Sequence, residues 1–147
     1  MATEGGRIMS TAAQIADILN AAQVSFYDCD RVIREGIPWG VVADFKKELE
    51  LTDGELAGIL DISQRTLSRL RQSGGRLTTS SGDRFYRVIR MYSLARKVFE
   101  EDRSAREWLH RSQAGLGGRT PLDFLRTEAG AREVEDLLGR MEYGVIA

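Results

Sequence analysis

The sequence predicts an all-α fold. Apolar residues recur at spacings of three and four in most of its segments, which is the period of a helix with one buried face. Strand-like alternation never extends beyond a few residues, and no internal repeat is visible. With 147 residues, 42% hydrophobic and 29% charged, the chain has the composition of an ordinary soluble protein. Its length suits one domain, or one domain with a small appendage.

The first third of the chain is expected to hold two helices. Residues 1–9 are predicted to form a disordered leader, and Ser10 or Thr11 is the candidate cap of a helix that ends near residue 23. Pro38, a residue favoured at the first helical position, opens a second helix over residues 39–49.

Residues 53–72 satisfy the local demands of a helix-turn-helix. Ala57 is small where the first helix crosses the second, Asp61 tolerates the left-handed conformation of the turn, and Ser63 caps the second helix. The shared apolar seam consists of Leu56, Leu60, Ile62, Leu67 and Leu70.

The second helix of this motif is the one that enters the major groove of DNA. Its exposed residues are expected to be Gln64, Arg65, Thr66, Ser68, Arg69, Arg71 and Gln72. We expect Gln64, Arg65, Ser68 and Arg69 to contact base edges, because Arg pairs with guanine and Gln with adenine. Thr66 is also expected to belong to the DNA-binding surface, and Arg71 and Arg76 are expected to contact phosphates. The alternative is a solvated helix face on a packing domain that does not bind DNA.

The second half of the chain is predicted to hold further helices. A Ser/Thr-rich loop is expected over residues 77–82 and a long helix over residues 83–99. A short helix over residues 105–109 precedes a break at Gly117 and Gly118. Thr120, Pro121 and Asp123 then form a capped helix start, and a last helix follows Thr127.

The formal net charge of −1 conceals a strong polarity along the chain. Residues 1–62 carry five basic and eleven acidic side chains, residues 63–111 twelve basic and five acidic, and residues 112–147 four basic and six acidic. A basic middle segment between acidic flanks indicates that one face meets a polyanion and the other faces meet something else.

Two parts of the sequence resemble known families. Residues 55–57 and 62–69 are similar to the helix-turn-helix of Xre/Cro-type regulators, and Asp61 is the one departure from the usual Gly. Trp108, Leu109, the stretch LGGRTPLDFL at residues 116–125, Thr127, Glu128, Gly130, Ala131 and residues 143–145 resemble the C-terminal domain of Xre/ParS/MbcA-type antitoxins. Ser112 and Gln113 depart from the Pro-Asn that is frequent there. With residues 35–38, the resemblance extends from about residue 33 to the end.

The resemblance implies an Xre/Cro-like helix-turn-helix bundle over residues 10–99 and a small helical toxin-binding domain over residues 100–147. It also implies a bacterial toxin–antitoxin system whose partner is a RES-domain toxin, an enzyme that consumes NAD⁺, and repression of the operon through operator DNA. Our hypothesis is that an apolar tail covers the toxin's NAD⁺ cleft. The tail residues are Arg140, Tyr143, Gly144, Val145, Ile146 and Ala147. The alternative is that the tail packs on its own domain or on a second copy.

No catalytic, cofactor or metal site is expected, and an enzyme is therefore disfavoured. His110 is the sole histidine and has no cysteine or histidine at metal-ligand spacing. The acidic clusters at residues 100–102 and 133–136 are interpreted as solvated surface or as a docking surface for a basic partner. The chain shows no secretory signal and no apolar run near the ~20 residues of a membrane span. Cys29, the single cysteine, fits a reducing cytoplasm and a small buried side chain.

Three classes of function stay open at this point. They are an antitoxin that also represses transcription, a stand-alone dimeric repressor, and an interaction module with a vestigial helix-turn-helix. The apolar tail and the second domain favour the first class, and the Arg-rich second helix of the motif disfavours the third. One helix-turn-helix contacts only a few base pairs, so a homodimer is expected, formed through the helix over residues 83–99 or through the first helix.

Overall fold

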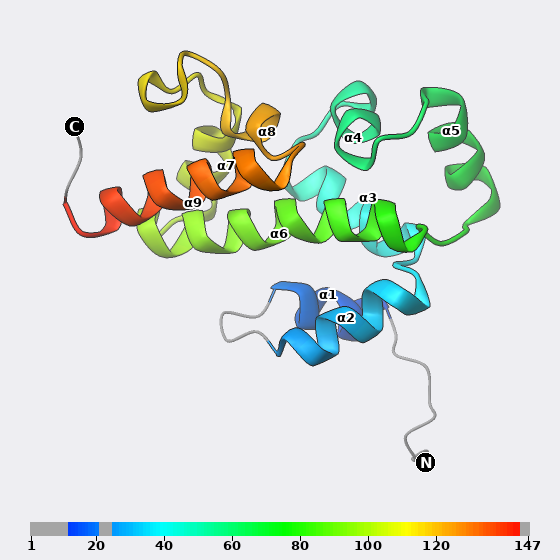
Figure 1. Ribbon diagram of the computed structural model, residues 1–147. Coiled ribbons are helices and arrows are strands. Elements are labelled where there is room, and N and C mark those ends of the chain that lie inside the picture. The colour runs from blue at the N-terminus through cyan, green and yellow to red at the C-terminus, as the bar shows by residue number, and fades with distance from the viewer. Residues whose placement is uncertain (1–11, 21–24, 145–147) are drawn as a thin grey trace.

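A long central helix organises the molecule. The computed structural model describes residues 12–20 and 25–144, and this part of the chain is helical and contains no strand, which confirms the expected all-α class. The helices are α1 (Ala12–Asn20), α2 (Phe26–Glu35), α3 (Trp39–Glu48), α4 (Asp53–Leu60), α5 (Gln64–Ser73), α6 (Thr79–Phe99), α7 (Asp102–His110), the 3₁₀ turn η1 (Ala114–Leu116), α8 (Pro121–Phe124) and α9 (Glu128–Glu142). Helix α6 runs through the middle, with α9 and α7 along one half and α1 and α2 beneath it (Figure 1).

One hydrophobic core joins the two halves of the chain. It extends from Ile15 in α1 to Leu138 in α9, and α6 supplies its centre. The buried residues of α6 include Phe85, Val88, Ile89, Met91, Tyr92 and Ala95. Because the apolar face of α6 is buried within one chain, the helix-turn-helix and the C-terminal helices are held against a common support.

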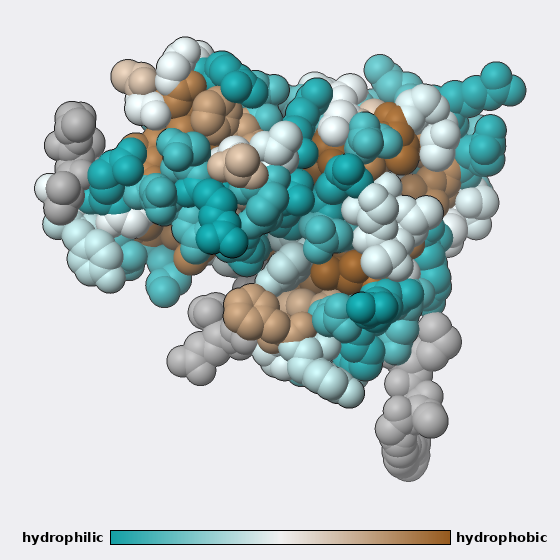
Figure 2. Space-filling model, viewed as in Figure 1, coloured by the Kyte–Doolittle hydropathy of each residue, from teal (hydrophilic) through white to brown (hydrophobic). Residues whose placement is uncertain are grey.

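The polar surface is broken at a few points by large apolar side chains. On the face shown in Figure 2, hydrophilic residues predominate and hydrophobic ones reach the surface in separate, smaller areas. In the described residues, Phe26, Tyr27 and Tyr143 are the large hydrophobic side chains that are mostly exposed, at 72%, 80% and 81%. No helix in residues 12–20 and 25–144 combines the length and the apolar character that crossing a membrane requires.

The structure contains one helix that the sequence did not predict, and one sequence-based expectation was wrong. Helix α2 was not predicted, although Ser25 caps it by accepting a hydrogen bond from the backbone N–H of Asp28, and Cys29, Val32 and Ile33 form its buried side. The Ser/Thr stretch expected to be a loop over residues 77–82 instead begins α6, because the Thr78 side chain accepts from the backbone N–H of Ser81. The leader at residues 1–9 and the end of the first helix at residues 21–23 lie outside the described residues.

Candidate nucleic-acid interface and toxin-binding domain

The turn between α4 and α5 is built as the sequence predicts. Asp61 has φ 58° and ψ 47°, the left-handed conformation, and ends α4. Ser63 caps α5 by accepting a hydrogen bond from the backbone N–H of Thr66 at 3.0 Å. At the other end of α4, Thr52 and Glu55 form a reciprocal capping box. Both short helices therefore start and stop at residues with local reasons to do so.

Helix α5 presents a polar face that protrudes from the core. Leu67 is buried and Leu70 half-buried against the rest of the motif. The other side, which we call the recognition face, is exposed and consists of Gln64, Arg65, Thr66, Ser68, Arg69, Arg71 and Gln72. Among the described residues, Arg65 and Arg69 have no ion-pair partner, so both guanidinium groups are available to an anion. Figure 1 shows α5 at the edge of the molecule, at the far end from the C-terminus.

The two arginines expected to contact phosphates both have partners within the chain. Arg71 Nη2 lies 2.7 Å from Asp53 Oδ1, and its guanidinium lies 5.4 Å from the centre of the Trp39 ring. Lys46 Nζ is 3.2 Å from the same carboxylate oxygen. The hydrogen bonds from Arg71 and then from Lys46 lower the pKa of Asp53, so this carboxylate is ionised at neutral pH.

Arg76 lies at the end of the segment after α5. Its Nη1 donates a hydrogen bond of 2.7 Å to the carbonyl of Gly36, and its backbone pairs with Pro38 in an isolated antiparallel bridge. Arg76 thus fastens the segment after α5 to the segment before α3. Sequence reasoning could not show this contact, because it joins residues 40 apart in the chain.

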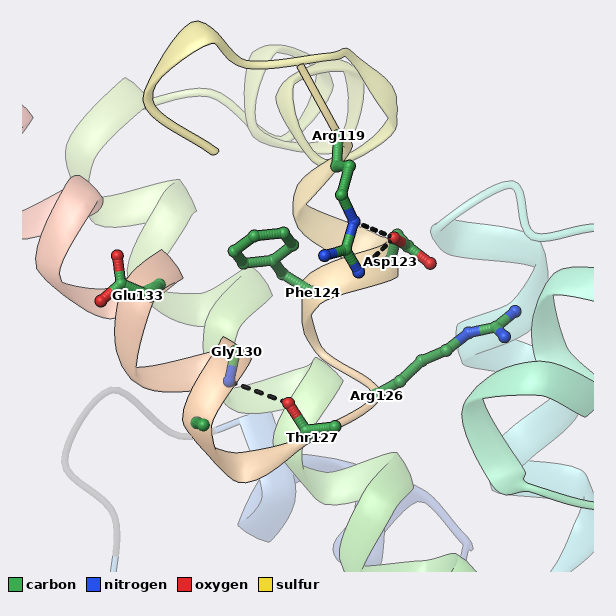
Figure 3. Close-up of a pocket in the computed structure, with 8 residues that line it drawn as sticks. Arg119, Asp123, Phe124, Arg126, Thr127, Gly130 and Glu133 are labelled. Carbon is green, nitrogen blue, oxygen red and sulfur yellow. Dashed lines mark hydrogen bonds and ion pairs between the residues drawn. The ribbon is translucent and has the colours of Figure 1, made fainter. Parts of the chain in front are cut away.

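The C-terminal half contains a hollow at the corner between α8 and α9. It has a volume of about 500 Å³, and its lining includes Arg119, Phe124, Thr127 and Glu133 (Figure 3). The Arg119 guanidinium is 4.2 Å from the centre of the Phe124 ring and forms an ion pair of 2.6 Å with Asp123. The hollow is therefore framed by an aromatic ring and by charged groups of both signs.

The corner is fixed by two capped helix starts. Thr120 accepts a hydrogen bond from the backbone N–H of Asp123 at the start of α8, with Pro121 at the first helical position. Thr127 accepts one from the backbone N–H of Gly130 at the start of α9, as Figure 3 shows. Gly130 has no room for a side chain, since an added Cβ would overlap the carbonyl oxygen of Phe124. The sequence revealed the caps but not the hollow, whose walls come from two helices and the link between them.

The C-terminal half also contacts the helix-turn-helix directly. The Arg126 guanidinium extends to α4, where a side chain on Gly58 would collide with it. In α7, His110 Nε2 lies 2.7 Å from the Leu49 carbonyl and therefore donates to it, while Nδ1 is 3.7 Å from Glu55. His110 therefore links α7 to the segment before α4 and to α4 itself. Within the described residues, no group of His, Cys, Asp and Glu is arranged to hold a metal ion.

The start of the expected toxin-binding tail is exposed. Arg140 lies on the surface near the end of α9, and Tyr143 follows that helix with 81% of its surface exposed. Tyr143 therefore does not pack on its own domain. Gly144 has φ +73°, a conformation that favours glycine. Val145, Ile146 and Ala147 lie outside the described residues.

Comparison with known proteins identifies both halves of the chain. A model of the Antitoxin Xre-like helix-turn-helix domain matches residues 29–90, and one of the Antitoxin Xre/MbcA/ParS C-terminal toxin-binding domain matches residues 94–144. A protein named Antitoxin Xre from Photorhabdus laumondii is 32% identical over 117 residues, 79% of each chain. Another of that name from Yersinia enterocolitica is 34% identical over 116 residues, 78% of each chain. A third, from Pseudomonas putida, is 28% identical over 71% of this chain and 76% of its own. The chain therefore belongs to the Xre family of antitoxins and has both the helix-turn-helix and the toxin-binding domain of that family.

Proposed function

We propose that this antitoxin neutralises a RES-domain toxin by direct binding and represses its own operon as a homodimer on operator DNA. The toxin would consume NAD⁺, and both activities would take place in the bacterial cytoplasm. The observation that carries the proposal is that one core presents two separate surfaces. The first is the recognition face of α5, and the second belongs to the toxin-binding domain that ends at the exposed Tyr143. We also propose a domain boundary between residues 99 and 100. The helix-turn-helix match ends at residue 90 and the toxin-binding match begins at residue 94, both within α6.

We further propose that the tail makes the inhibitory contact. An exposed aromatic side chain after the last turn of α9, followed by Val145 and Ile146, offers a ring and apolar groups in one segment. A cleft that binds a dinucleotide accepts groups of these kinds, because part of it is built for a flat base. Arg140, one turn before Tyr143, would pair with an acidic group at the rim.

The test is co-expression of the chain with the product of the neighbouring gene, with cellular NAD⁺ as the readout. Deletion of residues 143–147 and the Tyr143→Ala variant should each leave NAD⁺ unprotected. Tyr27→Ala is the matched control, because Tyr27 is equally exposed, at 80%, but lies on α2. If both tail variants protect NAD⁺ as well as the unmodified chain, the tail does not inhibit the toxin. If the unmodified chain does not protect NAD⁺, a stand-alone dimeric repressor is the better interpretation.

DNA binding is tested with a duplex taken from the region upstream of the chain's own coding sequence. Replacing Arg69 with alanine should weaken binding by about 1–3 kcal/mol, the usual contribution of a bidentate base contact. Arg132→Ala is the control, since Arg132 is an exposed arginine on α9. Equal affinities of the two variants would contradict a role of the recognition face in DNA binding. Sedimentation of the free and DNA-bound protein would show whether it is a dimer.

A further inference from the structure

A basic groove lies beside the recognition face, and Arg71 is its one residue among the expected DNA contacts. It has a volume of about 570 Å³ and is lined by α3, the start of α4 and the last turn of α5. Trp39, Lys46 and Lys47 contribute from α3, and Arg71 contributes from α5. Arg71 follows Gln64 by seven residues, so both lie on the same side of α5. The groove therefore adjoins the recognition face, on the side where the phosphate backbone of DNA bound to α5 would lie.

Two of the three cations of this groove pair with Asp53, and its other carboxylate, Glu50, pairs with Arg106 of α7. Asp53, the first residue of α4, accepts both Arg71 at 2.7 Å and Lys46 at 3.2 Å on its Oδ1 atom. The Trp39 ring lies 5.4 Å from the Arg71 guanidinium and limits its other positions. The backbone N–H of Trp39 donates to the carbonyl of Gly75, which fixes the start of α3 next to the end of α5. The arrangement is therefore a small ion cluster held by three helices.

The cluster is open to solvent and can be exchanged for another anion. The side chains of Arg71 and Asp53 are 40% and 43% exposed, and that of Lys46 is 25% exposed. The equilibrium between the paired and the separated state of an exposed ion pair favours pairing by only a few-fold, because water and salt compete for both partners. A phosphate that approached Arg71 and Lys46 would compete with Asp53 for them and would also be repelled by its charge.

We infer that Asp53 competes with the DNA backbone for Arg71 and Lys46. By holding these two cations, Asp53 lowers the affinity of the antitoxin for DNA. This inference rests on the proposed DNA binding. It assigns the groove to the sugar-phosphate backbone, with Arg71, Lys46 and Lys47 as its cations, and Lys47 has no ion pair within residues 12–20 and 25–144. Asp53 thus determines how strongly the antitoxin binds DNA of any sequence, and the base contacts of α5 then account for a larger share of the total affinity.

The expected effect of Asp53→Asn is tighter binding with a steeper dependence on salt. Each released pair should contribute about two- to three-fold, so the dissociation constant should fall by about three- to ten-fold at low salt. Each additional phosphate contact steepens the slope of log K against log salt by about 0.9, so a change of about 1 to 2 is expected. The fold should be retained, because the Thr52 and Glu55 capping box does not use the Asp53 side chain.

The experiment measures binding of the full chain to a labelled duplex of mixed sequence, about 30 base pairs long, between about 50 and 200 mM NaCl. Asp44→Asn is the matched control, because it removes one negative charge from α3, and Asp44 is an exposed acid with no ion pair in the described part of the chain. The double variant Asp53→Asn with Arg71→Ala should lose most of the gain. If Asp44→Asn tightens binding as much as Asp53→Asn, or if the double variant keeps the full gain, the effect is one of net charge and the inference is wrong. If the unmodified chain binds neither this duplex nor its upstream DNA, the proposed DNA binding fails instead.

Discussion

Replacing Gly130 with alanine should destabilise the corner between α8 and α9. An added Cβ would overlap the carbonyl oxygen of Phe124 and would lie 3.0 Å from the Thr127 hydroxyl. The obstacle is backbone, so relief requires a shift of the link between α8 and α9. Overpacking of this kind costs about 1–3 kcal/mol, and disturbing the Thr127 cap adds about 1 kcal/mol. The better helix propensity of alanine offsets about 0.5–1 kcal/mol of this cost. The free energy of unfolding should therefore fall by about 2 kcal/mol.

The assay is thermal and urea unfolding followed by far-UV circular dichroism. A loss of about 2 kcal/mol corresponds to a fall in Tm of roughly 4–8 °C for a chain of this size. Gly139→Ala is the control in the same helix, because no atom lies within 4 Å of the position its Cβ would take. This variant should be unchanged or more stable by about 0.5–1 kcal/mol. Equal stability of the two variants would refute the argument that the Phe124 carbonyl requires a glycine at position 130.

Three further predictions concern the helix-turn-helix and the core. Asp61→Gly should raise the free energy of unfolding by about 0.5 kcal/mol, because Asp61 has a left-handed conformation that costs a non-glycine residue energy; a decrease in urea unfolding would contradict this. Ser81→Ala should lower it by about 1–2 kcal/mol, since the buried Ser81 hydroxyl donates to the Leu60 carbonyl at 2.9 Å; an unchanged Tm would show that the bond contributes nothing. Burial raises the pKa of the Cys29 thiol above its ordinary range and that of the Tyr86 phenol to about 12. The folded state therefore keeps protons that the unfolded chain releases, so the contribution of these two groups to stability should be fully present below about pH 8 and should fall as the pH rises further. A urea midpoint that rises with pH in this range would be inconsistent with that sign.

The elements that the sequence predicts well are those with a local cause. The start of α8 at Thr120 and Pro121, the left-handed Asp61 and the cap at Ser63 each depend on a few neighbouring residues. Helix α2 has local signals of the same kind. Ser25 is its cap, and Cys29, Val32 and Ile33 have helical spacing.

The features that the sequence could not predict depend on residues distant in the chain. The Ser/Thr stretch before Asp83 looks like a loop because its composition is polar, yet Ser81 is buried and bonded to Leu60 in α4. The positions of Arg71 and Arg76 were likewise predicted from charge alone. Their partners, Asp53 and the Gly36 carbonyl, are 18 and 40 residues away. The helical pattern therefore predicted which polar side chains of α5 are exposed, but not what those side chains contact.

The polarity of charge along the chain serves the fold as much as any partner. Of the twelve basic side chains in residues 63–111, eight form ion pairs within the described part of the chain. Six of the eight pair with acids of the flanking segments, namely Asp53, Asp61, Glu128, Glu135, Glu48 and Glu50. The acidic flanks thus hold α6 and α7 to their neighbours. Because Asp53 holds Arg71 and Lys46, Arg65 and Arg69 are the cations of the recognition face that have no ion pair in the described part of the chain. So few free cations in one protomer should give weak binding to DNA, because Lys and Arg contacts to phosphates supply much of the affinity. The proposed operator binding would then need a second protomer on the same duplex, which is a physical argument for the proposed homodimer.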